Sequence, residues 1–244
     1  MRYSLIFTGL LLFAAVNAAA QTIVIYDPLV KSPSEKPYSA EKKLVQRYAL
    51  PAARSRFGDE SGCDGSDLRI VGVSNGSFTR SGAKQKAVVY ELCQVGNGMA
   101  RNGIAIFEAG KPIAHFTESG GWNTEVKTIA DINKNGRSEL YIETSGGMYQ
   151  GYTGTSVTLY EIDASAVKSL GTFINYTNEC GAEEDGDFCD RALKITANAG
   201  RVPKFFEQEF ENTSKTDVPR WSPAGTRKAA KVIVAEEAFN REKI

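Results

Sequence analysis

The sequence contains one histidine, His115, and four cysteines, so it has few of the side chains that zinc sites and histidine-dependent catalysis use. The CxxC pairs of a typical zinc site are absent, and a zinc site is therefore not expected. There is also no Gly-x-Ser-x-Gly elbow and no phosphate-binding glycine loop, so no catalytic residue is assigned. His115 lies in the alternating stretch Pro112–Phe116 and is expected to be an ordinary strand residue.

An excess of charge of either sign is also lacking, because 29 lysines and arginines balance 29 aspartates and glutamates. Such a balance gives no electrostatic footprint for nucleic acid or for anionic lipid. After residue 20 no long apolar run occurs, so the mature chain is expected to have no transmembrane segment.

The first 20 residues have the pattern of a cleavable signal peptide. Arg2 precedes the apolar run Leu5–Val16, and small residues follow at Ala18–Ala20. The alternative is a membrane anchor, but the run is shorter than the roughly 20 apolar residues that a spanning helix needs. We therefore expect export to the periplasm or the extracellular space, with the mature chain beginning near Gln21.

An even number of cysteines in an exported chain favours disulfides. Four cysteines allow three connectivities, and two pairs are favoured here. Cys63 with Cys93 would tie a loop to a strand, and Cys180 with Cys189 would close a short acidic loop.

A repeated strand plan is the clearest organisation in the chain. Gly76–Gly82 aligns without a gap on Ala130–Gly136, about 54 residues later. The strand-like runs Ala87–Leu92 and Leu140–Thr144 follow these segments, each before a glycine-rich turn, and Lys231–Val234 is a further expected strand.

The expected fold is therefore mainly β, with antiparallel four-stranded units of the kind found in β-propeller blades. One short helix is expected over Ser39–Arg47, capped by Ser39 and ending near Pro51. The corresponding division is a signal peptide 1–20, an N-terminal segment 21–67, a first repeat 68–118, a second repeat 119–177 and a disulfide-stapled C-terminal β region 178–244.

The segment from Asp131 to Leu140 carries the most specific motif. Oxygen-bearing side chains alternate, Gly136 allows a sharp turn, and a carboxylate follows at the ninth position. Calcium prefers such flexible sets of oxygen ligands. The alternative is an Asx-type turn without metal, in which Asp131 and Asn133 bond backbone amides. The expected ligands of a calcium ion of modest affinity are Asp131, Asn133, Asn135, the Arg137 carbonyl and Glu139.

This loop resembles the FG-GAP repeat of integrin-type and bacterial VCBS β-propellers, whose loops run Asp-x-Asn-x-Asp-Gly-x-x-Asp-Leu between strands. The resemblance implies blade-forming strands, a structural calcium and roles in adhesion or ligand binding. The first repeat has Ser77, Thr79 and Ser81 at the ligand positions and is expected to hold no ion. The repeats visible in the chain are fewer than a seven-bladed ring requires.

Two further segments are candidate binding sites. Gly146–Tyr152 forms a glycine-rich hairpin with Tyr149 and Tyr152, near Trp122 in sequence, and aromatic residues on such loops contact sugars or proteins. The alternative is that the tyrosines cover a sheet edge. The acidic loop Cys180–Asp190 could hold a cation or face a basic partner, although acidic loops are usually solvated.

The leading hypothesis is an exported, non-enzymatic binding module with an unknown protein or polysaccharide ligand. A second hypothesis is an envelope-associated assembly protein that forms homo-oligomers, because few repeats leave sheet edges to pair. A hydrolase that uses two carboxylates is a third; it would need a carboxylate pair outside the Asp131 loop.

Overall fold

The computed structural model describes residues 21–30, 37–149, 152–178, 190–214, 219–233 and 239–243, with the backbone alone at 148 and 149. The expected signal peptide, Met1–Ala20, lies outside the described residues. No helix in the described part is long and apolar enough to cross a membrane.

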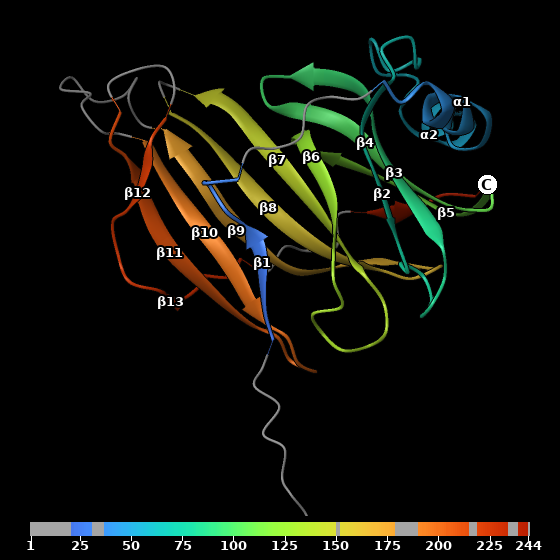
Figure 1. Ribbon diagram of the computed structural model, residues 1–244. Coiled ribbons are helices and arrows are strands. Elements are labelled where there is room, and N and C mark those ends of the chain that lie inside the picture. The colour runs from blue at the N-terminus through green and yellow to red at the C-terminus, as the bar shows by residue number, and fades with distance from the viewer. Residues whose placement is uncertain are drawn as a thin grey trace, which may run out of the picture.

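Within the described residues the strands form two antiparallel sheets, one of nine strands and one of five (Figure 1). The mainly β prediction is therefore confirmed. The five-stranded sheet has the order β14-β5-β4-β3-β2. Its strands are β2 (Arg69–Gly76), β3 (Gln85–Gly96), β4 (Met99–Glu108), β5 (Lys111–Gly120) and β14 (Asn240–Arg241).

The nine-stranded sheet has the order β12-β11-β10-β9-β8-β7-β6, with β1 paired to β10 and β13 paired to β11. Its strands are β1 (Thr22–Tyr26), β6 (Trp122–Ile129), β7 (Glu139–Tyr149), β8 (Tyr152–Ile162), β9 (Val167–Asn178), β10 (Asp190–Asn198), β11 (Lys204–Asn212), β12 (Trp221–Pro223) and β13 (Lys228–Ala229). β10 pairs with β9 over residues 190–192 and with β1 over residues 195–198, so the sheet branches at this point.

The two predicted repeats are consecutive antiparallel meanders, β2 to β5 and β6 to β9, but they do not form separate blades. β9 pairs onward with β10, so the second meander continues into a larger sheet. The described strands show no closed propeller, and the expected propeller-like units are instead parts of two packed open sheets. The physical reason is that a blade ends in an unpaired edge, whereas the outer edge of β9 is partly paired with the C-terminal region.

The cores lie on both faces of each sheet. Alternate residues of a strand point to opposite faces, so β3 supplies Tyr90 to one core and Val89 to another. The first core lies between the helices and the five-stranded sheet, and the second lies between the two sheets. The third covers the other face of the nine-stranded sheet, where Tyr141 and Phe173 pack against Ile25 of β1. We call this last surface the inner face.

The edge strands of the two sheets, β2 and β6, lie side by side. A Cβ on Gly72 of β2 would lie 2.7 Å from the Cβ of Val126 on β6. Thr128 on β6 donates a hydrogen bond from Oγ1 to the carbonyl oxygen of Asn75, at 2.7 Å. Each strand thereby covers the edge of the other, which reduces the exposed edge available for pairing with another chain.

Two helices cover the outer face of the five-stranded sheet, where one was expected. The helix α1 spans Ser39–Tyr48, and α2 spans Leu50–Phe57. Pro51 does not end the helical region, because it lies in the first turn of α2, where no intrahelical partner for its nitrogen is needed. Ser39 is the first helical residue rather than the N-cap, and no side chain caps α1.

A disulfide joins Cys63, in the loop after α2, to Cys93 on β3, with the two Cα atoms 5.0 Å apart. This is the pairing expected from the sequence, and it anchors the helical layer to the five-stranded sheet. The second expected pair, Cys180 with Cys189, lies outside the described residues, as does most of the acidic loop.

Candidate functional site

The β6–β7 loop, residues 130–138, is organised around the Asp131 carboxylate. Asp131 Oδ1 accepts a hydrogen bond from the amide of Asn135 at 3.0 Å, and Oδ2 accepts one from the amide of Gly136 at 2.7 Å. Lys134 and Gly136 have φ values of 60° and 82°, in the left-handed region that such a tight turn requires. These bonds are those of the Asx turn that the sequence left as the alternative to a calcium loop. They are compatible with both, because each carboxylate oxygen keeps a second lone pair.

Glu161 on β8 holds the other side of the loop. Its Oε2 accepts hydrogen bonds from the side-chain amides of Asn133 and Asn135, the latter at 2.6 Å, and its Oε1 pairs with the Arg137 guanidinium. Arg137 also donates to the carbonyl oxygen of Ile162 at 3.1 Å. The loop is therefore fixed to β8. Sequence reasoning missed Glu161 because it lies one strand beyond the motif.

Glu139 is the most unusual group in the loop. It is 1% exposed; its Oε2 accepts a hydrogen bond from the Ile132 amide at 3.0 Å, and its Oε1 has no hydrogen-bond partner among the described residues. Burial raises the pKa of Glu139 to about 7; the bond from Ile132 opposes this rise, and the nearby Asp131 carboxylate adds to it. A cation between these carboxylates would remove both the unpaired oxygen and the repulsion.

The donor chemistry of the loop fits a hard cation. Its donors are two carboxylates, two carboxamides and the Arg137 carbonyl, all of them oxygen ligands. No group of three or more His, Cys, Asp or Glu side chains in the described part of the chain could hold a metal ion. Three of the five ligands of such a site would be neutral oxygens, and so few charged ligands favour modest calcium affinity.

The loops of the two repeats are in direct contact. The amide of Ser138 donates to the carbonyl oxygen of Ser77 at 3.0 Å, and the amide of Ser77 donates to Ser138 Oγ at 3.2 Å. In the first loop the side chain of Gln85 bonds both the amide and the hydroxyl of Thr79, at 2.9 and 2.7 Å. A neutral amide thus has the organising role that the Asp131 carboxylate has in the second loop.

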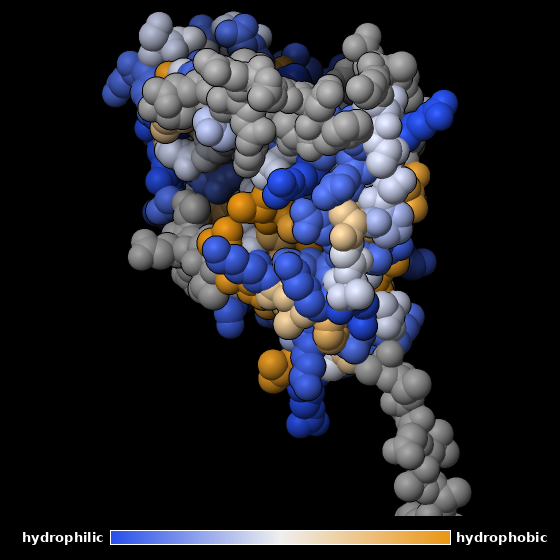
Figure 2. All heavy atoms as spheres, turned by 90° about the vertical axis from the view of Figure 1, so that its left-hand side faces the viewer, coloured by the Kyte–Doolittle hydropathy of each residue, from blue (hydrophilic) through white to orange (hydrophobic). Residues whose placement is uncertain are grey.

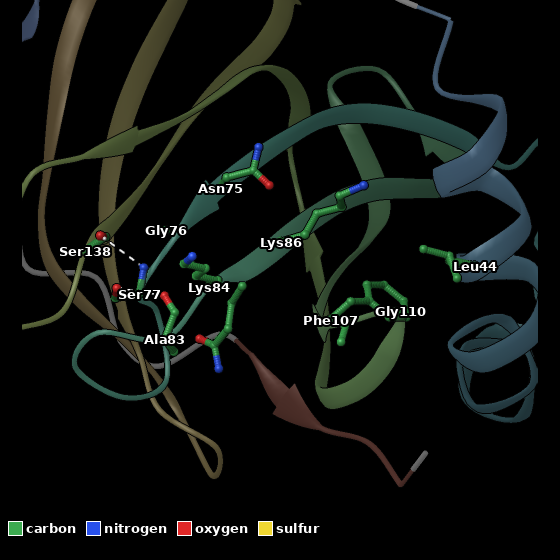
Figure 3. Close-up of a pocket in the computed structure, with 12 residues that line it drawn as sticks. Leu44, Asn75, Gly76, Ser77, Ala83, Lys84, Lys86, Phe107, Gly110 and Ser138 are labelled. Atoms are coloured by element: carbon green, nitrogen blue, oxygen red, sulfur yellow. Dashed lines mark hydrogen bonds between the residues drawn. The ribbon is translucent and has the colours of Figure 1, made fainter.

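A cavity of about 610 Å³ lies beside this junction (Figure 3). Figure 3 shows Leu44 and Phe107 on one side of it and Ser77, Lys84 and Ser138 on the other. The volume is in the range of ligand pockets, and the lining combines apolar and polar groups as such pockets do. Sequence reasoning missed it, because α1, β3 and the β4–β5 turn meet there through tertiary packing alone.

The aromatic residues of the predicted hairpin site differ in their exposure to solvent. The Trp122 indole is half-buried and donates a hydrogen bond to the carbonyl oxygen of Met99 at 3.1 Å. Tyr152 is 48% exposed, and the side chain of Tyr149 lies outside the described residues. Trp122 thus joins β6 to the β3–β4 hairpin, whereas Tyr152 remains accessible. Gly98 in that hairpin has no room for a side chain, because a Cβ there would lie 2.1 Å from the carbonyl oxygen of Gly146.

A polar cluster that the sequence did not reveal lies on the inner face. Glu125 and Glu143 occupy opposite positions on β6 and β7, as do Lys127 and Tyr141. We call the following residues the inner-face cluster: Tyr26, Glu125, Lys127, Tyr141, Glu143 and Asn175. Alternation along β6 and β7 indicates a shared face, but the register that brings the two glutamates together cannot be read from one sequence.

The cluster supplies the carboxylate pair outside the Asp131 loop that a hydrolase would require. Both carboxylates, however, are engaged with donors of the protein. Glu143 accepts from Asn175 Nδ2 at 2.6 Å and from Thr124 Oγ1 at 2.9 Å, and Glu125 lies 3.6 Å from the Lys127 ammonium. This arrangement favours a binding or structural role over proton donation to a leaving group.

His115 is fully buried and its Nε2 lies 2.7 Å from the Tyr90 hydroxyl. Burial lowers the pKa of His115 to about 4, so the ring is neutral at pH 7. Its place within β5 agrees with the expected strand residue.

Comparison of the chain with protein-family models, with curated proteins and with solved structures found no match in any of the three. The FG-GAP resemblance therefore rests on the loop motif and the repeat plan.

Proposed function

We propose that this chain is an exported, non-enzymatic binding module whose sheet scaffold is stabilised by calcium in the β6–β7 loop. The observation that carries the proposal is the buried Glu139 carboxylate, which has an unpartnered oxygen beside Asp131. We further propose that the two meanders are FG-GAP-type repeat units in an open arrangement. The Cys63–Cys93 disulfide supports a periplasmic or extracellular location, where such bonds persist.

The ion would be held by the carboxylates of Asp131 and Glu139, the side-chain oxygens of Asn133 and Asn135, and the carbonyl of Arg137. Calcium bound there supplies a positive charge that offsets the repulsion between two buried carboxylates. The loop contacts the first repeat through Ser138 and the β10–β11 turn through a hydrogen bond from the Gly200 amide to the Ile132 carbonyl, at 2.8 Å. Calcium binding would therefore stabilise both sheets at once.

The cavity beside the loop is the proposed ligand site. Ser138 belongs to its wall and adjoins Glu139, so an ordered calcium loop would keep one side of the cavity in place. A protein segment or a saccharide unit would find apolar contact at Leu44 and Phe107 and hydrogen-bonding groups opposite them.

Homo-oligomer formation remains a second candidate, because apolar side chains are exposed on one side of the molecule. Figure 2 shows them gathered near the middle of the face that carries β11 and β13. Val232 and Ile233, which follow β13, are 38% and 42% exposed. Such a patch is compatible with contact between copies.

Calorimetric titration of chelator-treated protein with calcium chloride tests the proposal. The parent should bind one ion with a dissociation constant of about 10⁻⁴ to 10⁻³ M, as extracellular modules do. Asp131→Ala and Glu139→Gln should each weaken binding by at least about tenfold, because each removes one of two charged ligands.

Asp163→Ala is the matched control. Asp163 organises the β8–β9 turn through bonds from the amides of Ser165 and Ala166, at 2.6 and 2.8 Å, and is outside the proposed ion site. Its variant should bind calcium as the parent does. Equal heats for the parent and Asp131→Ala would contradict the proposed site.

Trp122 and Tyr152 should respond differently to replacement by alanine. Trp122→Ala is expected to lower the free energy of unfolding by about 2 kcal/mol, because it removes a half-buried ring and leaves the Met99 carbonyl without its donor. Tyr152→Ala should stay within about 0.5 kcal/mol of the parent, since the ring is largely exposed. Urea unfolding measures the free energy of unfolding of both variants. Equal losses would contradict the half-buried, hydrogen-bonded position of Trp122 and the exposed position of Tyr152.

A further inference from the structure

The inner-face cluster places like charges where a sheet normally avoids them. Glu125 and Glu143 are directly opposite in the register of β6 and β7. Carboxylates at directly opposed positions destabilise an antiparallel pair. Natural proteins keep such destabilising arrangements chiefly at functional sites, so the opposed glutamates point to a function.

The cluster also contains a buried hydroxyl with no bonding partner. Tyr141 is 0% exposed, and its hydroxyl has no hydrogen-bond partner among the described residues. Glu143, Glu125 and Tyr26 lie close enough to act electrostatically on this hydroxyl. A buried polar atom without a hydrogen bond destabilises the folded state unless a ligand or a water molecule supplies the missing partner.

The cluster already holds one ammonium group. Lys127 Nζ lies 3.9 Å from the centre of the Tyr141 ring and 3.6 Å from Glu125 Oε1. The Lys127 side chain is 36% exposed, so it has room to move aside. Within the described residues Glu143 forms no ion pair; its known donors are the neutral groups of Asn175, Thr124 and Thr155. Glu143 is therefore a carboxylate of the cluster that no cation among the described residues neutralises.

We propose that the inner-face cluster binds a small organic ammonium ion. The Glu143 carboxylate would accept the ammonium hydrogens, and the Tyr141 hydroxyl would supply a further acceptor. Tyrosine ring faces attract cations, as the position of Lys127 demonstrates. Burial raises the pKa of Tyr26 to about 12, so this phenol also stays neutral near pH 7 and can accept a hydrogen bond. The site goes beyond the proposed function and requires no calcium.

The Lys127 ammonium and the ligand ammonium would compete for the same position beside Tyr141 and the two glutamates. A ligand ammonium near Tyr141 and the glutamates is repelled by Lys127 until that side chain turns to solvent. Removal of the Lys127 charge should therefore increase affinity, whereas removal of the Glu143 charge should decrease it. A purely structural cluster would show neither effect.

The test is a two-dimensional NMR titration of the mature protein with n-butylammonium chloride, and with 1-butanol as the neutral comparison. We expect saturable shifts of amides on β6 and β7 with n-butylammonium and none with 1-butanol. Glu143→Gln, which keeps an oxygen for Asn175, should weaken binding by about tenfold or more. Lys127→Met should strengthen it by about threefold or more.

Lys168→Met, an exposed lysine on β9, is the control and should bind as the parent does. The proposal is overturned if neither the parent nor Lys127→Met binds n-butylammonium, if 1-butanol binds equally well, or if Glu143→Gln retains the affinity of the parent. Thermal midpoints of the variants show whether each is folded. A failed titration leaves the calcium measurement unaffected, so the two proposals fail independently.

Discussion

Replacement of both Cys63 and Cys93 by alanine is expected to lower the free energy of unfolding by about 3.5 kcal/mol. The bond closes a loop of 30 residues, and its loss releases that loop's entropy in the unfolded chain. Both cysteines belong to the core beneath α1 and α2, and the residues are 0% and 2% exposed. Urea unfolding of the parent and the double variant measures the difference, with a separate slope fitted to each because the unfolded variant is less compact.

Reduction of the parent provides the control for this measurement. Dithiothreitol should reproduce at least the loss seen in the double variant, and it should have a smaller effect on the double variant itself. A loss below about 1 kcal/mol would show that the helical layer is held by packing alone.

The second large effect concerns Glu118 on β5, which is 8% exposed. Burial raises the pKa of Glu118 to about 7, and a hydrogen bond from Asn102 partly opposes the rise. The folded protein therefore holds this proton more tightly than the unfolded chain does. The resulting stability is complete below the ordinary pKa of 4.5 and is lost as the pH rises through 7. At pH 8 the loss approaches about 3 kcal/mol.

Glu118→Gln removes the titrating group and keeps an oxygen that can accept from Asn102. The variant should match the parent near pH 4.5 and exceed its stability by up to about 3 kcal/mol at pH 8. Denaturant unfolding across this pH range measures the difference. Glu211→Gln, at an exposed position of β11, should show a difference that does not change with pH in this way. A flat difference for Glu118→Gln would contradict the buried carboxyl.

Local patterns were enough to find most strands. The predicted runs Ala87–Leu92 and Leu140–Thr144 fall within β3 and β7, because β-branched and aromatic residues bounded by glycine-rich turns favour strands. Three disulfide connectivities were possible from the sequence, and the favoured Cys63–Cys93 pair is the one that the structure contains. Lys231–Val234 was expected to be a strand, but the described part of this segment makes an isolated bridge from Ile233 to Thr172.

Features set by long-range pairing were not predictable. The pairing of β9 with β10 depends on hydrogen bonds between the second meander and the C-terminal region. The prediction of two separate four-stranded units was therefore wrong. The second helix was missed because Pro51 was interpreted as a helix stop when it is a helix start. Glu161 and the Glu125–Glu143 pair come from neighbouring strands whose register one sequence does not determine.

The most direct test of a calcium-stabilised scaffold is thermal unfolding of the oxidised, mature protein, first in chelator and then with increasing calcium, for the parent and for Asp131→Ala. At about 100 times the dissociation constant, an ion that binds the folded state alone adds about 2.7 kcal/mol. We predict that the midpoint rises with calcium for the parent and stays constant for Asp131→Ala. A parent midpoint that does not change with calcium would contradict the account and would identify the β6–β7 loop as an Asx turn without an ion.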